Sequence, residues 1–250
     1  MQIVGRGFLA GHLESIASAH PRAVVLAAGV SATSDTSHDD YGREAAVLYD
    51  TADRCASRGE RLVFFSTASA GMYSVPGRVG KESGPVFPAT PYGRHKLALE
   101  TVLASSTVDY LILRLAHVVG PRQPPHQLLP SLAAQIRAGV VSIQRGAQRD
   151  LIDVDDVVRI IDELLSTGVS REVVNVASGV AVPAEQIVDH LEMRLGRTAE
   201  RRYNDSLRAQ AVSVEKLRAL APCVRDMNFG PDYFRAVLDK YVTSFAGTPS

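Results

Sequence analysis

Tyr92 and Lys96 are the residues whose types and spacing most directly suggest chemistry in this 250-residue sequence. Two residues four positions apart lie on one face of a helix, one above the other. An ammonium beside a phenol favours the phenolate and lowers the tyrosine pKa from its usual ~10. A tyrosine tuned in this way can give a proton to a carbonyl oxygen or take one from an alcohol. The same spacing also occurs on many helices as a solvated pair, so the interpretation depends on context.

Part of that context is a run of hydroxyl groups that follows the apolar stretch Leu62–Phe65. The run contains Ser66, Thr67 and Ser69. Hydroxyls at the carboxyl end of a parallel strand lie beside the crevice where α/β sheets bind ligands. Such a hydroxyl can share a substrate oxygen with a tyrosine and stabilise developing charge. The alternative is a Ser/Thr-rich turn that satisfies its own backbone.

A glycine-rich turn is the second candidate, with the sequence Gly5-Arg6-Gly7-Phe8-Leu9-Ala10. It fits the pattern G-x-G-x-x-G/A, in which the last residue need only be small for helix–strand packing. Gly5 permits a tight turn, and Gly7 lets a pyrophosphate approach the backbone at a helix N-terminus. An ordinary glycine turn is the alternative. The apolar stretch before it and the amphipathic segment after it favour the cofactor interpretation.

Apolar runs alternate with helix-period segments through the first two thirds of the chain. The runs are residues 2–4, 23–27, 62–65, 110–113 and 173–176, and the helical segments are Phe8–Ala19, Tyr41–Arg58, Tyr92–Ser105 and Val154–Ser166. Apolar runs without polar alternation are typical of parallel strands covered on both faces. The alternation therefore predicts an α/β fold with a parallel sheet and right-handed crossovers. Further helices are expected over Ala184–Leu195, Val214–Leu220 and Tyr233–Phe245.

The connection between the glycine turn and the next strand is short. Fifteen residues separate Gly7 from Ala23, and Phe8–Ala19 fills most of them. A complete dinucleotide-binding unit has further strands here, with an acidic residue ~20 positions after the glycines that holds the adenosine ribose. We therefore predict a shortened sheet that lacks the second and third strands and has an exposed adenosine site. No carboxylate then excludes a 2′-phosphate, and Arg6 could pair with one, so NADPH is favoured and NADH remains an alternative.

Seven segments in one order resemble the extended short-chain dehydrogenase/reductases of the NDP-sugar epimerase/dehydratase group. The segments are residues 5–10, 26–31, 64–69, 91–96, 113–121, 149–157 and 175–179. The resemblance covers about residues 1–200, and the short length looks like the NDP-4-keto-6-deoxyhexose 4-ketoreductases of antibiotic sugar pathways. It implies a Rossmann-type domain over 1–120 and about 147–180. A mostly helical substrate-binding portion is expected over about 121–146 and 181–250.

The resemblance assigns roles to the catalytic candidates one residue at a time. Tyr92 matches the acid/base tyrosine of the group, and Lys96 matches its lysine partner, which also holds the cofactor ribose. Thr67 matches the third catalytic residue because it is the second residue of the Ser-Thr pair that ends the strand. Counting back from Tyr73 favours Ser69 instead, so both hydroxyls remain candidates.

The resemblance also implies a set of cofactor-binding residues. These are Gly5, Arg6, Gly7, Phe8 and Leu9 in the turn, Ala27 and Ala28 after the next strand, Lys96 and His117. His117 stands where the group commonly has an asparagine that contacts the sugar diphosphate. It could still donate to a phosphate, and the alternative is a satisfied, half-buried histidine. Arg149 matches an arginine often used on a substrate phosphate, and its alternative is a surface salt bridge with Asp150 or Asp153.

Composition excludes several classes of function. Lysine plus arginine and aspartate plus glutamate number 27 each, so the chain lacks the basic footprint of a nucleic-acid-binding protein. Two cysteines and seven scattered histidines predict neither a metal site nor a disulfide scaffold. No apolar run approaches the ~18 residues of a membrane helix, and no signal pattern begins the sequence. A cytoplasmic location is therefore expected.

These features and the resemblance together predict an NAD(P)H-dependent ketoreductase that reduces a carbonyl of an NDP-4-keto-6-deoxyhexose, a small-molecule ketone of an antibiotic deoxysugar pathway. Epimerisation and dehydration return the hydride to a bound intermediate and need a tightly retained cofactor, which an exposed adenosine site does not favour. Three alternatives stay open: a ketoreductase for another secondary-metabolite ketone such as an aromatic polyketide, an NDP-sugar epimerase, and a non-catalytic cofactor-binding sensor. The resemblance also implies a homodimer, for which the helices at 41–58 and 92–105 could supply the surface.

Overall fold

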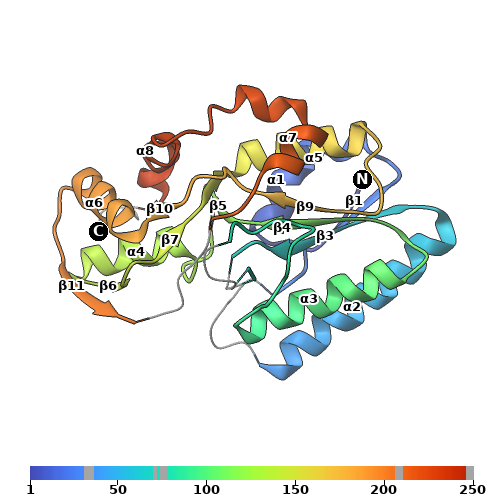
Figure 1. Ribbon diagram of the computed structural model, residues 1–250, viewed down its shortest axis with the longest axis horizontal. Coiled ribbons are helices and arrows are strands. Elements are labelled where there is room, and N and C mark those ends of the chain that lie inside the picture. Colours follow the sequence, from blue (N-terminus) through green and yellow to red (C-terminus); the bar gives the residue numbers. More distant parts are fainter. Residues whose placement is uncertain (31–36, 70–71, 74–77, 206–210, 246–250) are drawn as a thin grey trace.

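A parallel sheet of five strands forms the centre of the larger part of the molecule (Figure 1). The structure is a computed structural model that describes residues 1–30, 37–69, 72–73, 78–205 and 211–245. In spatial order the strands are β1 (Gln2–Val4), β2 (Ala23–Leu26), β3 (Arg61–Thr67), β4 (Asp109–Leu115) and β9 (Glu172–Val176). Every neighbouring pair is parallel, and each strand overlaps one of the predicted apolar runs. The predicted Rossmann-type α/β fold is confirmed.

The sheet is shortened, as predicted. Residues 5–22 are all described and contain only α1 (Phe8–Leu13) and the 3-10 helix η1 (Glu14–Ala19). β1 therefore pairs with β2 in register Gln2 to Val24 and lies at the edge of this sheet. The predicted helix over Phe8–Ala19 changes to a 3-10 helix after Leu13. The Ser15 hydroxyl donates to the His12 carbonyl there (3.0 Å), a local hydrogen bond that competes with regular helix.

Helices cover both faces of the sheet (Figure 1). α2 (His38–Arg58) and α3 (Pro91–Ser105) lie on one face, whereas α1 and α5 (Val154–Ser166) lie on the other. Leu48 and Leu103 pack with Ile112 on the first face, and Val157 packs with Val174 on the second. Apolar side chains on both faces of each central strand explain why these strands read as continuous apolar runs.

A second group of elements has a core of its own. It contains α4 (Leu128–Arg137), α6 (Ala184–Leu195) and α8 (Tyr233–Phe245), whose buried side chains include Leu132, Leu191 and Leu238. Three strand pairs complete it: β6 (Val140–Gln144) with β11 (Glu200–Asn204), β7 (Gln148–Arg149) with β10 (Val182–Pro183), and β5 (His117–Val119) with β8 (Leu151–Asp153). The helices at 184–195 and 233–245 match the predictions. The strands were not predicted, because pieces of two to five residues carry little periodicity.

The segment between β11 and α8 returns to the central sheet. α7 (Glu215–Leu220) and the 3-10 helix η2 (Pro222–Asp226) contribute Leu217 and Val224 to the same core cluster as β4, β9 and α5. The division into two domains stays a prediction. No helix within the described ranges has an apolar stretch long enough to cross a bilayer.

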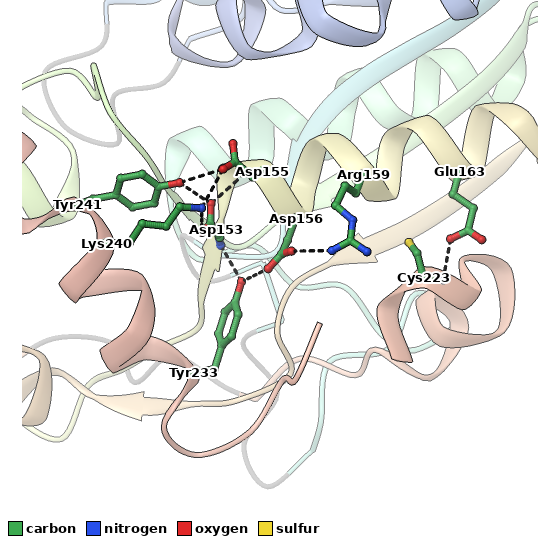
Figure 2. A network of polar contacts seen from close by, with 9 residues as sticks. All are labelled: Asp153, Asp155, Asp156, Arg159, Glu163, Cys223, Tyr233, Lys240 and Tyr241. Carbon is green, nitrogen blue, oxygen red and sulfur yellow. Dashed lines mark hydrogen bonds and ion pairs between the residues drawn. The ribbon is translucent and has the colours of Figure 1, made fainter. Parts of the chain in front are cut away.

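A polar network fastens α8 to the start of α5 (Figure 2). Asp153 caps α5 by accepting from the Asp155 N–H, and it also accepts from the Lys240 ammonium and the Tyr241 hydroxyl, both at 2.7 Å. The Tyr233 hydroxyl donates to Asp156 (2.6 Å) and accepts from the Asp153 N–H (2.9 Å). The acidic cluster at the start of α5 therefore has a structural role.

Candidate active site

A cavity of about 560 Å³ lies where the carboxyl ends of the central strands meet the second group of elements. Its size is within the range of small-molecule sites, and this is the side of an open α/β sheet where ligands bind. Phe8, Thr67, Tyr92 and Lys96 are among the lining residues from the sheet and its helices. The cavity therefore brings together candidates from three separate predicted motifs.

The start of α3 positions the tyrosine and the lysine. The Thr90 hydroxyl accepts from the Gly93 N–H (3.0 Å), and Pro91 occupies the first turn. This arrangement is a well-capped N-terminus. Tyr92 then lies in the first turn and Lys96 one turn later, with its Nζ atom 5.6 Å from the centre of the Tyr92 ring. The predicted juxtaposition of phenol and ammonium is present.

Lys96 is almost fully buried, with 2% of its surface exposed. Its Nζ donates to the Phe65 carbonyl (3.1 Å) and to Glu44 Oε1 (2.5 Å). These are its two hydrogen-bond acceptors among the described residues, whereas an ammonium has three N–H groups. The third N–H is left for a ligand in the cavity that Lys96 lines.

Glu44 is a site residue that the sequence interpretation missed. Its other carboxylate oxygen lies 3.0 Å from His95 Nε2 and accepts from the Val30 N–H (3.2 Å). It shares the buried face of α2 with Leu48 and Cys55. A carboxylate on an otherwise apolar helix stripe was the signal in the sequence, because buried charges require partners.

The net shift of the Tyr92 pKa differs in sign from the prediction. Lys96 lowers this pKa, as expected, but burial has a larger effect and raises it. The negative charge of Glu44 and the neighbouring Tyr41 raise it further. Tyr92 is therefore a protonated phenol at neutral pH, the form that can donate a proton to a carbonyl oxygen.

Thr67 and Ser69 both line the cavity at the end of β3. Their hydroxyl oxygens lie 2.9 Å apart, and the Ser69 N–H donates to Thr67 Oγ1 (3.0 Å). The predicted backbone-satisfying turn is thus present together with the hydroxyl pair. Since either hydroxyl can donate to the other, both remain candidates for the third catalytic group.

The glycine turn packs tightly against the loop after β2. Gly5 has a φ of +130°, and a Cβ atom there would lie 2.6 Å from the Ala27 carbonyl carbon. A Cβ atom added at Gly7 would lie 4.0 Å from its nearest neighbour, the Ala27 carbonyl oxygen, so the Gly7 backbone is open to a ligand. Gly7, Phe8, Leu9 and Ala27 line the cavity.

The other predicted cofactor-binding residues of this turn and loop do not line the cavity. Arg6 and Ala28 are exposed, and neither they nor Gly5 line the cavity. No described side chain caps α1, so the N–H groups of its first turn have no side-chain acceptor. An open glycine backbone and an uncapped helix start fit the pyrophosphate of a dinucleotide. The residues present therefore fit this class of cofactor.

His117 and Arg149 also line the cavity. Burial and the charge of Arg149 lower the pKa of His117 to about 3, so this histidine is neutral. Arg149 donates to the Gln148 carbonyl (2.9 Å) and to the Gln144 side chain. Within the described ranges it forms no ion pair with Asp150 or Asp153, which was the alternative expectation. A partly buried guanidinium that lines a cavity without a carboxylate partner is suited to an anionic ligand.

Neutral polar side chains from the second group of elements also line the cavity. Gln135, Ser142, Gln144 and Asn204 line it, and the Asn204 amide donates to the Ser142 hydroxyl (3.1 Å). The sequence interpretation missed these residues, because they lie on α4, β6 and β11 and no motif connects them. Amides and hydroxyls of this kind recognise a ligand that carries many neutral hydrogen-bonding groups.

Comparison with known proteins adds evidence from sequence. The model of the NAD dependent epimerase/dehydratase family matches residues 11–177. A dTDP-6-deoxy-L-talose 4-dehydrogenase (NAD(P)(+)) from Kitasatospora kifunensis is 32% identical over 146 residues, which are 52% of this chain and 45% of that protein. The chain thus aligns with somewhat under half the length of this curated relative. The family match begins after the glycine turn, so the cofactor role of that turn depends on its geometry.

Solved structures share the fold. The structure of RMD from Pseudomonas aeruginosa complexed with NADPH has a TM-score of 0.80 at 19% identity and covers 98% of this chain and 99% of its own. UDP-glucose 4-epimerase from Thermus thermophilus in complex with NAD has a TM-score of 0.76 at 23% identity, with 97% and 83% covered. MoeE5 in complex with UDP-glucuronic acid and NAD has a TM-score of 0.70 at 25% identity, with 87% and 78% covered.

Proposed function

Because the chain belongs to the NAD dependent epimerase/dehydratase family, we propose that it is an NAD(P)H-dependent ketoreductase of nucleotide-linked keto sugars. The substrate we propose is an NDP-4-keto-6-deoxyhexose of a secondary-metabolite pathway, such as those that make antibiotic deoxysugars. The 32% identical relative supports this substrate class, since its name describes a dehydrogenase that acts at C4 of a dTDP-6-deoxyhexose.

The proposal rests on one observation: Tyr92, Lys96, Thr67 and Ser69 all line the same cavity. The protonated Tyr92 donates its proton to the carbonyl oxygen as the alcohol forms. A hydroxyl of Thr67 or Ser69 donates a hydrogen bond to the same oxygen and stabilises its developing negative charge. Lys96 acts on Tyr92 through its positive charge, with its Nζ atom 5.6 Å from the centre of the Tyr92 ring.

The cofactor is assigned to the α1 side of the cavity. The backbone N–H groups of Gly7, Phe8 and Leu9 would hold its pyrophosphate, and Lys96 would hold the ribose next to the nicotinamide. When bound, the cofactor would supply the hydride for reduction of a carbonyl carbon. Arg6 is the residue we assign to a 2′-phosphate, which makes NADPH the preferred form.

The sugar nucleotide is assigned to the part of the cavity lined by His117 and Arg149. Arg149 is the cation for a phosphate oxygen, and the neutral His117 lies in the same cavity. The amides and hydroxyls of Gln135, Ser142, Gln144 and Asn204 then recognise the neutral parts of the substrate.

The test follows the absorbance of NADPH and NADH in the presence of a panel of NDP-4-keto-6-deoxyhexoses and polyketide ketones. We expect NADPH to be oxidised in proportion to alcohol formed with at least one sugar nucleotide. Oxidation with polyketide ketones alone would change the substrate class. If the protein co-purifies with NAD and interconverts sugar nucleotides without net oxidation or reduction of the cofactor, it is an epimerase. Cofactor binding without turnover of any ketone would contradict the proposed reaction and favour a sensor.

A further inference from the structure

We propose that Glu44 is a positioning residue of this site: its carboxylate holds the Lys96 ammonium beside Tyr92 and offsets part of that ammonium's charge. The catalytic consequence rests on the proposed function, whereas the charge balance among Glu44, Lys96 and Tyr92 does not. Glu44 does not belong to any motif of the resemblance described above, so the resemblance does not assign it this role.

Glu44 and Lys96 form a buried ion pair. The Glu44 and Lys96 side chains are 2% and 3% exposed, and their charged atoms are 2.5 Å apart. A carboxylate removed from water is retained only when its lone pairs are satisfied. Glu44 meets this condition with Lys96 Nζ, His95 Nε2 and the Val30 N–H. The carboxylate is therefore built into the site rather than placed there by chance.

The surrounding backbone makes room for the Glu44–Lys96 pair. Gly29 lies in the loop after β2, and a Cβ atom there would collide with Glu44 Oε1 and lie 3.0 Å from Lys96 Nζ. Gly29 and Val30 also line the cavity. Glu44 thus ties three elements together at one point: α2, the start of α3, and the loop that borders the cofactor region.

The charge of Glu44 also acts on Tyr92. The titratable groups that face it are Lys96 and His95 from α3 and Glu44 and Tyr41 from α2, while β3 contributes only neutral hydroxyls. Burial lowers the pKa of His95, which is therefore neutral at pH 7. Lys96 and Glu44 are then the two charges that act on the phenol, and they act in opposite directions.

Substitution of Glu44 by glutamine removes the negative charge and nearly preserves the side-chain shape. Loss of this negative charge makes Tyr92 release its proton more readily, because Glu44 raises the Tyr92 pKa. We expect the Tyr92 titration midpoint to fall by about one pH unit, the order of magnitude for one nearby unit charge at an effective dielectric constant of ~20. Glu44→Asp keeps the negative charge but moves it away from Tyr92, because the side chain is shorter. We therefore expect a smaller fall in the Tyr92 titration midpoint.

The midpoint is measured by carbon-13 NMR of protein labelled at tyrosine Cζ, with the Tyr92 signal identified by its loss in Tyr92→Phe. Asp53→Asn is the matched control, because it makes the same chemical change at an exposed position nine residues later on α2. We expect no shift in this control. An unchanged midpoint in Glu44→Gln, or an equal shift in Asp53→Asn, would overturn the proposal. If Glu44→Gln does not fold, an unchanged midpoint in Glu44→Asp overturns it.

A second readout connects the charge balance to the reaction. A reductase needs the protonated phenol, so the high-pH limb of the kcat profile should move to lower pH in Glu44→Gln by the same amount as the NMR midpoint. An NMR shift without any turnover by the wild-type protein refutes the proposed function and leaves the Glu44 inference intact. Turnover by the wild type with an unshifted NMR midpoint refutes only the inference.

Discussion

His117 and Arg149 face one cavity, and the charge of the guanidinium adds to burial in keeping the imidazole neutral. The pKa of about 3 lies well below the ~6.5 expected in the unfolded chain. As the pH falls below 6.5, His117 becomes protonated in the unfolded chain but stays neutral in the folded protein. The free energy of unfolding therefore decreases progressively between pH 6.5 and pH 3 on account of this residue.

His117→Asn should remove that acid sensitivity. The free energy of unfolding of the variant minus that of wild type should be about 1–2 kcal/mol larger at pH 5 than at pH 7.5. Urea denaturation at the two pH values measures this difference. His38→Asn is the control, because His38 is exposed at the start of α2. Identical pH dependence in wild type and His117→Asn would contradict a half-buried imidazole that stays neutral.

Tyr92→Phe should abolish most of the activity without affecting cofactor binding. The substitution removes only the hydroxyl that donates the proton, so kcat should fall by about 10²- to 10⁴-fold. The dissociation constant for NADPH, measured by fluorescence titration, should change less than about twofold. Tyr49→Phe makes the same change at a tyrosine that is 51% exposed on α2 and should retain full activity. Equal kcat values for Tyr92→Phe and wild type would exclude Tyr92 as the proton donor.

Arg6→Ala tests the assignment of NADPH. A charge-assisted hydrogen bond to a phosphate contributes about 1.5–3 kcal/mol, so the dissociation constant for NADPH should rise roughly 10-fold or more. NADH lacks the 2′-phosphate and should bind equally well to variant and wild type. Arg58→Ala, at an exposed position at the end of α2, serves as the control. A parallel loss of NADH and NADPH binding would place Arg6 on the pyrophosphate rather than on the 2′-phosphate.

The central sheet could be predicted from sequence because its strands are buried on both faces. Val24, Val63 and Leu111 are essentially inaccessible, and their neighbours along each strand are apolar as well. The shortened sheet followed from counting residues, since the 15 positions between Gly7 and Ala23 have room for one helical segment only. The pairs of short strands around β6 and β11 depend on contacts between distant segments and left no local pattern.

The candidate site could be predicted only where one local motif contains the residues. Tyr92 and Lys96 are one helical turn apart, so their spacing alone brings them together. Glu44 reaches Lys96 from another helix 52 positions earlier in the chain, and no local spacing reports that contact. The net direction of the Tyr92 pKa shift was wrong for the same reason, because burial and the Glu44 charge arise from the tertiary structure.

The network in Figure 2 predicts that α8 depends on Tyr233. Its hydroxyl donates to Asp156 and accepts from the Asp153 N–H, so Tyr233→Phe leaves two partly buried polar groups without this partner. An unsatisfied buried group costs about 1–3 kcal/mol, and we expect the free energy of unfolding to fall by about 2 kcal/mol. Urea denaturation measures the loss. Tyr203→Phe, at a tyrosine that is 43% exposed on β11, should change stability by less than about 0.5 kcal/mol. An equally small effect in Tyr233→Phe would mean that apolar packing, rather than the polar network, holds α8 against α5.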